Sequence, residues 1–304
     1  MTTAQQYFLT VVQQQSIARA AEQLYLSQQN LSNHIKRLDQ QYGVLFVRRP
    51  KFELTLAGEA LCKTLQQIKI LEQGLDARIQ EIQSKQYGVL RFGIHPARAR
   101  MILPRTLALY REIYPNVQIK LFFQDTYHDE KMLRDGALDL FLGVDTLPDP
   151  DFTYIHLQDE PIYFVASEQL IRDAGVILNW EAIPLSVLPR FSYLLSPMVS
   201  HFRQKIDRFM EEAGVEITEK MSVGDFEVQL MLAAQKEGAC FCAKMLLPKM
   251  DQINRDLEAG DKLCAFPIEQ LDVTSDISIV THRLAYRSKM LNGFIESIER
   301  TIGR

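Results

Sequence analysis

The sequence predicts a multidomain protein in which an all-helical N-terminal part precedes a larger α/β part. Apolar residues recur at helical spacing up to about residue 85, and from Gly88 onward short apolar runs alternate with helical patterns. Residues 1–87 hold ten Lys and Arg against seven Asp and Glu, a net of +3, whereas the rest holds 24 against 31, a net of −7. A basic head on an acidic body indicates two different tasks.

The bulk composition indicates a soluble globular protein. The 304 residues are 47% hydrophobic and 24% charged, and no run approaches the roughly 18 apolar residues of a membrane span. The N-terminus has neither the basic segment nor the long apolar core of a signal peptide. The cysteines (Cys62, Cys240, Cys242 and Cys264) are too scattered for a disulfide framework, so we expect a protein of the reducing cytoplasm, with no membrane association.

Three short helices and a small wing are expected in the head. An apolar stripe from Phe8 to Val12 marks the first helix, and Ser16 can cap a second that contains the small pair Ala20 and Ala21. Ser27 can cap a third, which Gly43 ends and which turns Leu31, Ile35 and Leu38 inward. The stretch "LFVRRPKFELT" then reads as a two-stranded wing.

The second and third helices form a helix-turn-helix pattern, in which the third helix enters the major groove of DNA. Its outer face is rich in amides and hydroxyls, which can pair with base edges, and cations follow where phosphates would lie. The alternative is a solvated helix face that happens to be amide-rich. The predicted DNA-binding residues are Ser27, Gln28, Gln29, Asn30, Ser32, Asn33, Lys36 and Arg37, with Arg48, Arg49 and Lys51 from the wing.

A long helix from Ala57 carries an apolar seam with spacings of three and four. One helix-turn-helix reads only a few base pairs, so a paired protein would gain affinity and specificity. The seam therefore predicts a dimer contact, and the alternative is a helix that packs on its own domain. The seam residues are Leu61, Leu65, Ile68, Leu75, Ile79 and Ile82.

After Gly88, candidate strands such as "VLRFGI", "VQIKLFF" and "LDLFLGV" are separated by helical patterns at 101–114 and 129–135. This alternation predicts βαβ units and a mostly parallel sheet. About 215 residues of this pattern exceed one small sheet, so we expect two lobes. Ligands of such sheets bind at the carboxyl ends of the strands.

The segment "FLTVVQQQSIARAAEQLYLSQQNLSNHIKRLDQQYG", followed by "LTLAGEAL", resembles the winged helix-turn-helix of LysR-type transcriptional regulators. The α/β pattern also fits that family, so the resemblance covers essentially the whole chain. Two departures stand out: Gln29 and Asn30 replace residues that are often Pro or Ser and Ala, and the wing is about one residue shorter.

The resemblance implies a winged helix-turn-helix domain over 1–58, a linker and dimerisation helix over 59–87, and an effector-binding domain over 88–304. The last resembles periplasmic solute-binding proteins, with lobe I at 88–161 and 269–304 and lobe II at 162–268. It also implies allosteric control by a small effector and an antiparallel pair of linker helices, with further contacts toward a homotetramer. The implied partners are double-stranded promoter DNA, a small-molecule effector and a second copy of the chain.

Three loop segments are expected to meet in the effector cleft: "HPARAR", "FQDTYH" and "LLSPMVSH". The predicted effector-binding residues are His95, Ala97, Arg98, Arg100, Thr126 and Ser196. Thr126 matches a family position that commonly touches the effector, and Ser196 could cap a helix that starts near Met198. We hypothesise an anionic effector, for example a carboxylate, because of the two arginines and the helix N-terminus beside them. The alternative is that both arginines are solvated surface residues.

Two rival functions remain open. An enzyme is not indicated, because the chain lacks G-x-G-x-x-G after a strand, a P-loop and H-E-x-x-H, and its six histidines are dispersed; we predict no catalytic, metal or cofactor site. A thiol-based redox sensor could use Cys240 and Cys242, which lie in an apolar segment where buried packing is the alternative. A free solute-binding module is opposed by the basic helix-turn-helix.

Overall fold

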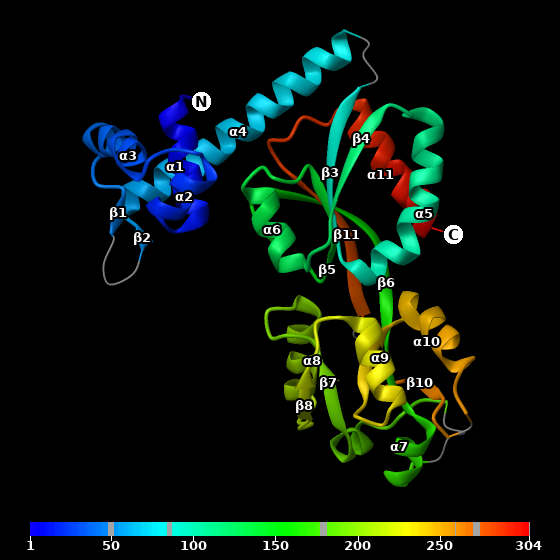
Figure 1. Ribbon diagram of the computed structural model, residues 1–304. Helices are drawn as coiled ribbons and strands as arrows, with labels where there is room; N and C mark the ends of the chain where they lie inside the picture. The colour runs from blue at the N-terminus through cyan, green and yellow to red at the C-terminus, as the bar shows by residue number, and fades with distance from the viewer. Residues whose placement is uncertain (48–51, 84–86, 177–180, 259, 270–273, 304) are drawn as a thin grey trace. The chain divides into compact units, whose positions relative to one another are not determined.

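The computed structural model describes residues 1–47, 52–83, 87–176, 181–258, 260–269 and 274–303 (Figure 1). The chain divides into two compact units. The first holds Met1–Lys85 with Arg134–Gly136 and Leu284–Ser288, and the second holds Gln86–Leu133, Ala137–Arg283 and Lys289–Arg304. Among the described helices, none has the combination of length and apolarity that crossing a membrane requires.

The first unit begins with three helices, α1 (Thr3–Gln14), α2 (Ile17–Gln23) and α3 (Gln28–Tyr42). Each is capped by a hydroxyl that accepts a backbone N–H: Thr2 from Gln5, Ser16 from Arg19 and Ser27 from Asn30. These caps set where each helix starts, as the sequence predicted for Ser16 and Ser27. Gly43 follows α3 with φ of +90°, a backbone conformation that glycine adopts without strain.

The wing is a two-stranded antiparallel ribbon, β1 (Phe46–Val47) and β2 (Glu53–Leu54). Phe46 packs between Phe8 and Phe52, which joins the wing to the helical core. The long helix α4 (Leu56–Ile82) follows, capped by Thr55. Gly58 in its first turn is needed for close packing, because a Cβ there would lie 2.1 Å from the carbonyl oxygen of Leu45.

The second unit is built on a seven-stranded sheet with the order β10-β6-β11-β5-β3-β4, and β9 also pairs with β6. The parallel strands β3 (Gly88–Ile94), β4 (Val117–Phe122) and β5 (Leu140–Val144) form lobe I with the antiparallel β11 (Thr274–His282). Helices α5 (Pro96–Ile113) and α11 (Lys289–Ile302) share a core with these strands, and α6 (Thr126–Arg134) follows β4. The fold class predicted from the sequence is confirmed.

One strand, β6 (Phe152–Ser167), runs through both lobes. Its first part, to Pro161, pairs with β11, and its second part, from Ile162, pairs with β9 (Cys240–Ala243) and β10 (Leu263–Pro267). Pro161 lies at the junction of these two parts. The proline is tolerated because it lies where the pairing partner changes.

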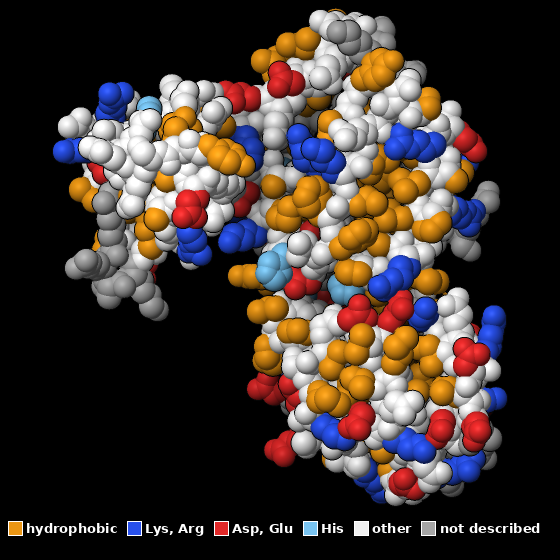
Figure 2. All heavy atoms as spheres, viewed as in Figure 1, with side chains coloured by type: hydrophobic (Ala, Val, Ile, Leu, Met, Phe, Trp, Pro, Cys, Tyr) orange, Lys and Arg blue, Asp and Glu red, His pale blue; other side chains and the backbone are white. Residues whose placement is uncertain are grey.

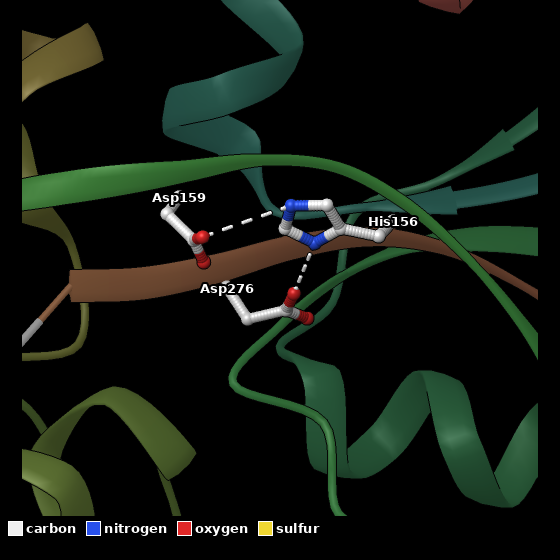
Figure 3. A group of neighbouring side chains, drawn as sticks. All are labelled: His156, Asp159 and Asp276. Carbon is white, nitrogen blue, oxygen red and sulfur yellow. Dashed lines mark hydrogen bonds and ion pairs between the residues drawn. The ribbon is translucent and has the colours of Figure 1, made fainter.

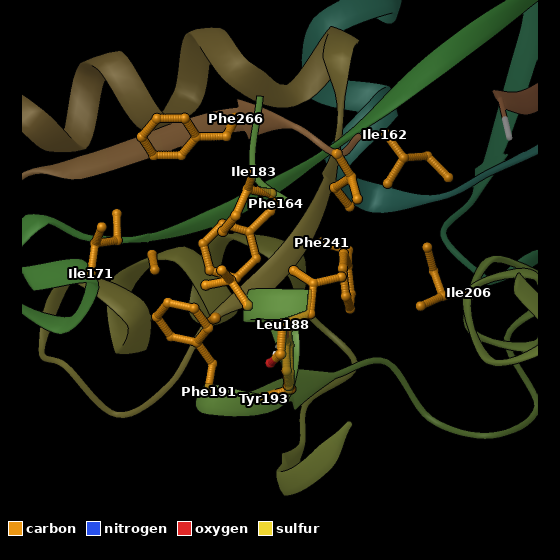
Figure 4. Close-up of a cluster of buried hydrophobic side chains, with 14 of the residues drawn as sticks. Ile162, Phe164, Ile171, Ile183, Leu188, Phe191, Tyr193, Ile206, Phe241 and Phe266 are labelled. Atoms are coloured by element: carbon orange, nitrogen blue, oxygen red, sulfur yellow. Dashed lines mark hydrogen bonds between the residues drawn. The ribbon is translucent and has the colours of Figure 1, made fainter. Parts of the chain in front are cut away.

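Lobe II has its own core. The parallel pair β7 (Ser192–Leu195) and β8 (Thr218–Ser222) adjoins β9 through a bridge between Tyr193 and Ala239. In its centre Tyr193 stacks on Phe241 with ring centroids 5.1 Å apart, beside Phe164 and Phe191 (Figure 4). The lobe II helices are α7 (Glu168–Asp173), η1 (Leu185–Arg190), α8 (His201–Glu212), α9 (Phe226–Ala234), η2 (Lys244–Leu246) and α10 (Leu247–Asn254).

Candidate functional sites

The third helix divides into a buried face and a polar face. Leu31, Ile35 and Leu38 are fully or almost fully buried in the core of the head. Most of the predicted DNA-reading residues of α3 are exposed, and Ser32 is half-buried. Ser27 is exposed as well, but its Oγ accepts the backbone N–H of Asn30 at 3.2 Å. The polar face does not pack against the rest of the head, so packing does not explain why it is rich in amides. It is therefore available to contact a partner.

The wing contribution cannot be placed in the same way. Arg48, Arg49 and Lys51, which the sequence predicted to contact DNA, lie outside the described residues. On the described part of the head, Lys36 and Arg37 supply exposed positive charge on α3. Their place after the amide-rich turn matches the order of base contact and then phosphate contact along a recognition helix.

The apolar seam of α4 has two parts with different surroundings. Leu61, Leu65 and Ile68 pack into the core of the head, which is the alternative that the sequence left open for the seam. Leu75, Ile79 and Ile82 are 58%, 43% and 74% exposed. Leu71, which was not among the predicted seam residues, is also exposed and lies one turn before Leu75. We call Leu71, Leu75, Ile79 and Ile82 the exposed seam.

A pocket lies between the two lobes of the second unit, and we call it the interlobe pocket. Its walls come from loops after the carboxyl ends of parallel strands: His95 follows β3, Asp125 follows β4, Ser196 follows β7 and Gly224 follows β8. About 620 Å³ of space lies between these walls, and part of it is open to solvent. Histidine and acidic side chains gather on the surface between the lobes (Figure 2).

Four of the six predicted effector residues line the interlobe pocket: His95, Arg98, Thr126 and Ser196. Ala97 instead packs into a hydrophobic cluster of lobe II residues, and Arg100 is not among the lining residues. The remaining lining residues were not predicted from the sequence: Asp125, Val144, Ser200, His201, Phe202, Gly224, Phe226, Ala243 and Leu246. Asp125 could have been found, because it precedes Thr126 at the end of a predicted strand.

The two arginines that suggested an anionic effector are each paired with a carboxylate. Arg98 is 4% exposed, and its Nη2 lies 2.7 Å from Oε2 of Glu160, which is 2% exposed. Its Nη1 contacts Sδ of Met245 at 3.5 Å. Arg100 is half-exposed and pairs with Glu227 at 2.9 Å. Both positive charges are therefore matched within the protein.

The N-terminus of α5 also offers fewer donors than predicted. Its first residue is Pro96, which has no N–H, and Nδ1 of His95 accepts the N–H of Ala97 at 3.3 Å. Burial lowers the pKa of His95, so its ring is neutral at neutral pH. The start of α5 therefore offers an anion fewer backbone donors than the sequence indicated.

The hydroxyls of the pocket have structural partners. Thr126 Oγ1 accepts the N–H of Val144 at 3.1 Å, and Ser196 Oγ accepts from Gln229 at 3.4 Å. The predicted cap by Ser196 of a helix near Met198 is wrong, because α8 starts at His201 and Ser200 caps it. Pro197 and the turn before Ser200 keep the chain from becoming helical earlier.

Carboxyl groups concentrate around the start of α6. Asp125 lines the pocket, and its Oδ1 accepts the backbone N–H of His128 at 2.9 Å. Asp129, one turn later, is fully buried, and neither of its oxygens has a hydrogen-bond partner among the described residues. Burial, and then the charges of Asp125 and Glu130, raise the pKa of Asp129 to about 8. Gly93 leaves the space for this carboxyl, since a Cβ there would lie 2.4 Å from Asp129 Oδ1.

The lobes are linked by polar contacts beside the pocket. Lys205 of α8 pairs with Asp145, which follows β5, and donates to the carbonyl oxygen of Thr274 at 2.5 Å. Asp145 also accepts the Ser275 hydroxyl at 3.0 Å. Because a change in lobe closure must rearrange such contacts, they are places where a bound ligand can influence the conformation.

The cysteines are in environments that suppress thiol chemistry. Cys240 and Cys242 lie on β9 and are fully buried. Burial raises the pKa of Cys240 to about 12, and that of Cys242 well above its ordinary value. Since the thiolate is the reactive form, neither residue is activated for reaction with peroxide.

One histidine–carboxylate cluster lies away from the pocket, on β6 and β11 (Figure 3). Nδ1 of His156 is 2.6 Å from Asp276, and Nε2 is 3.8 Å from Asp159. The histidines are too dispersed along the sequence to indicate a metal cluster, and it is the pairing of β6 with β11 that brings His156 close to two carboxylates. All three side chains are exposed or half-exposed.

Models of two protein families match the chain. The bacterial regulatory helix-turn-helix protein of the lysR family matches residues 3–59, and the LysR substrate binding domain matches residues 83–302. The HTH-type transcriptional regulator BenM of Acinetobacter baylyi is 27% identical over 241 residues, which is 76% of each chain. The Hca operon transcriptional activator HcaR of Escherichia coli is 32% identical over 160 residues, 52% of this chain and 54% of that protein.

Solved structures share the fold over nearly the whole chain. A full-length variant of OxyR from Pseudomonas aeruginosa aligns with a TM-score of 0.70 at 20% identity, covering 98% of this chain and 94% of that one. Full-length CbnR in complex with its target DNA aligns with a TM-score of 0.59 at 18% identity, covering 98% of both chains. At these identities the likeness concerns the fold alone.

Proposed function

Because the chain belongs to the LysR family of bacterial helix-turn-helix regulators, we propose that it binds promoter DNA as a dimer through α3 and responds to a small effector in the interlobe pocket. The observation that carries this proposal is the exposed amide-rich face of α3, backed by a well-packed apolar face. Gln and Asn side chains pair with adenine through two hydrogen bonds, and Ser can donate or accept. The solved complex of CbnR with its target DNA supports the same use of the fold.

We infer that a ligand changes DNA binding by changing lobe closure. The pocket walls come from both lobes, and the pair between Lys205 and Asp145 links them. A ligand shifts the balance between two arrangements of the lobes only to the extent that it binds one arrangement more tightly than the other. The effector is therefore expected to act on the arrangement of the paired heads rather than on α3 itself.

The wider assignment follows from this role. We propose a homodimer, with a homotetramer as a further step, acting on DNA in the bacterial cytoplasm. We expect no enzymatic activity and no cofactor, in keeping with the regulators among its relatives. The thiol-sensor alternative is disfavoured by the burial of Cys240 and Cys242. The domain bounds 1–58, 59–87 and 88–304 are proposed as the functional parts.

Two substitutions on α3 separate base reading from phosphate binding. Asn33→Ala should reduce the preference for the cognate duplex over a scrambled one by about tenfold, since a base contact is worth roughly 1–3 kcal/mol. Lys36→Ala should instead weaken binding to both duplexes alike and lower the salt slope by about one. Both side chains are exposed, so folding should be unaffected. Fluorescence anisotropy with labelled duplexes measures both effects.

The control for this experiment is Gln80→Ala, an exposed position on α4 far along the chain from α3. It should bind both duplexes like the unaltered protein. Unchanged sequence preference in Asn33→Ala would show that this residue does not face the bases.

The exposed seam of α4 is the proposed dimer contact. Replacing Leu75 and Ile79 together by Asp should shift the protein to monomers, because burying each apolar side chain is worth about 1.5–3 kcal/mol. The dimer constant should weaken at least about 100-fold, and cognate DNA affinity should fall with it. Both positions are exposed within one chain, so the melting temperature of the monomer should change little. Sedimentation velocity measures the assembly, and persistence of the dimer would contradict the proposal.

A further inference from the structure

A histidine and two carboxylates meet on the surface of the sheet, where β6 pairs with β11 (Figure 3). Asp159 and Asp276 lie directly opposite each other in this antiparallel pairing. Residues three apart on a regular strand point to opposite faces, but the register skips Leu157, so that His156 and Asp159 share one face. The group could not be predicted from the sequence, because 120 residues separate His156 from Asp276.

The two carboxylates lack a full counter-charge. Like charges directly opposite each other on paired strands are destabilising. Among the described residues, neither Asp159 nor Asp276 pairs with a lysine or an arginine, and each has His156 as its ion-pair partner. The nearby Lys205 is already matched by Asp145. A cation bound beside these carboxylates would therefore relieve a repulsion that the chain leaves partly unmatched.

Asp276 orients the imidazole ring of His156. Its Oδ2 lies 2.6 Å from Nδ1 of His156, and its Oδ1 accepts the hydroxyl of Ser278 at 2.7 Å. Because an ionised carboxylate can only accept, Nδ1 donates to it, and in the neutral ring Nε2 then carries the lone pair. Histidines that bind metals are commonly held in this way, by a carboxylate on the ring nitrogen that does not bind the metal.

The lone pair of Nε2 is on the side of the second carboxylate (Figure 3). Asp159 Oδ2 is 3.8 Å from Nε2, which is too long for a hydrogen bond. Two atoms that bind one Zn²⁺ at about 2.0–2.2 Å each can lie up to roughly 4 Å apart, so an ion fits between them with little movement. His156 and Asp159 are 53% and 61% exposed, which lets water complete the coordination.

We propose that His156 Nε2 and the carboxylate of Asp159 bind a divalent transition-metal ion such as Zn²⁺, with Asp276 as the positioning residue. This site goes beyond the proposed function and does not depend on it. Imidazole nitrogen suits Zn²⁺, Ni²⁺ and Cu²⁺, whereas Mg²⁺ and Ca²⁺ take oxygen ligands. Two protein ligands completed by water make a site whose ion exchanges with solution, unlike the closed four-ligand sites of structural zinc.

The site lies next to the link between the lobes. The backbone N–H of Asp276 donates to Oδ1 of Asp145 at 3.0 Å, and the N–H of Asp145 donates to the carbonyl oxygen of Asp276 at 2.9 Å. Asp145 in turn pairs with Lys205 of lobe II. Since β6 continues into lobe II after Pro161, a bound ion would stiffen the paired strands just before they reach the second lobe.

The test is calorimetry with the untagged full chain at pH 7, into which Zn²⁺ and Mg²⁺ are titrated separately. Because one ligand is an imidazole nitrogen, Zn²⁺ should bind at least about tenfold more tightly than Mg²⁺. A smaller preference would indicate a site made of carboxylates alone. That result, or no Zn²⁺ binding up to millimolar concentration, would overturn the proposal.

Variants locate the ion. His156→Ala and Asp159→Asn each remove one ligand and should weaken Zn²⁺ binding at least about 30-fold. His128→Ala is the matched control, because His128 is also 53% exposed but pairs with a single carboxylate, that of Asp125. It should bind Zn²⁺ like the unaltered protein. Unchanged affinity in His156→Ala, or a comparable loss in His128→Ala, would place the ion elsewhere and contradict the assignment. Circular dichroism checks that each variant folds.

Asp276→Asn distinguishes a positioning residue from a ligand. The amide oxygen of Asn can still accept the hydrogen bond from Nδ1 of His156, so Zn²⁺ affinity should fall only about tenfold. The preference for Zn²⁺ over Mg²⁺ should remain, because the ring nitrogen is still present. A loss as large as that of Asp159→Asn would show that Asp276 binds the ion directly, which would overturn its positioning role.

Discussion

Replacing Arg98 by methionine is expected to lower the free energy of unfolding by about 3–5 kcal/mol, because it leaves the buried carboxylate of Glu160 without its cation. Both side chains are almost fully buried, and the pair also bridges to Met245. The double variant Arg98→Met with Glu160→Met should recover most of this loss, since apolar residues of similar volume can replace a buried pair. Urea denaturation followed by circular dichroism measures the three proteins.

Arg100→Met is the matched control, two residues away on the same helix. Arg100 is half-exposed and pairs with Glu227, and exposed pairs contribute about 0–1 kcal/mol. If Arg98→Met cost no more than Arg100→Met, the buried pair would not have the structural role that its geometry indicates. The same result would mean that Glu160 does not hold Arg98 strongly, so that Arg98 could bind an anionic ligand.

Asp129→Asn is expected to remove a large pH dependence of stability. The pKa of Asp129 is about 8 in the folded chain, and an unfolded Asp titrates near pH 3.9. Between these values the folded state binds the extra proton, so the unaltered protein loses stability as pH rises from about 4 to 8 and no further above it. From pH 5 to pH 8 the loss is about 4 kcal/mol, at roughly 1.36 kcal/mol per unit.

Unfolding curves in urea at pH 5, 6, 7 and 8 test this. Between pH 5 and pH 8 the free energy of unfolding of Asp129→Asn should fall by about 4 kcal/mol less than that of the unaltered protein. The stability of the variant relative to the unaltered protein should therefore increase as pH rises. Asp159→Asn, an exposed carboxylate, should follow the unaltered protein. Parallel profiles for Asp129→Asn and the unaltered protein would mean that Asp129 does not carry the raised pKa.

The head could be predicted closely because its signals are local. Ser16 and Ser27 cap helices within three residues, and Leu31, Ile35 and Leu38 share a face by spacing alone. The same spacing does not reveal the partner. Leu61 and Leu75 belong to one periodic seam, yet the first packs in the head and the second is exposed.

The position of the pocket could be predicted from the sequence, but the pairing of its charged side chains could not. The carboxyl ends of parallel strands bring His95, Arg98, Thr126 and Ser196 together, as the strand pattern indicated. The partner of Arg98, however, is Glu160, 62 residues away on the strand that crosses both lobes. Such a pairing depends on the lobe geometry, which periodicity does not contain.

These features describe a regulator whose parts have separate physical tasks. The polar face of α3 is free for DNA, the exposed seam of α4 is free for a second chain, and the interlobe pocket combines polar acceptors with an apolar wall. The buried pair of Arg98 and Glu160 and the partly exposed link of Lys205 to Asp145 lie beside that pocket. We expect the ligand to act on the latter, because a partly exposed link is easier to break.

The affinity of the full chain for a duplex from upstream of its own gene tests the central claim most directly. Anisotropy titrations at about 50 and 200 mM salt should show a loss of roughly a thousandfold, as expected for a dimer that neutralises several phosphates. At the higher salt the cognate duplex should bind about a thousandfold more tightly than a scrambled one. Equal affinity for the two duplexes, or binding that does not change with salt, would contradict the account.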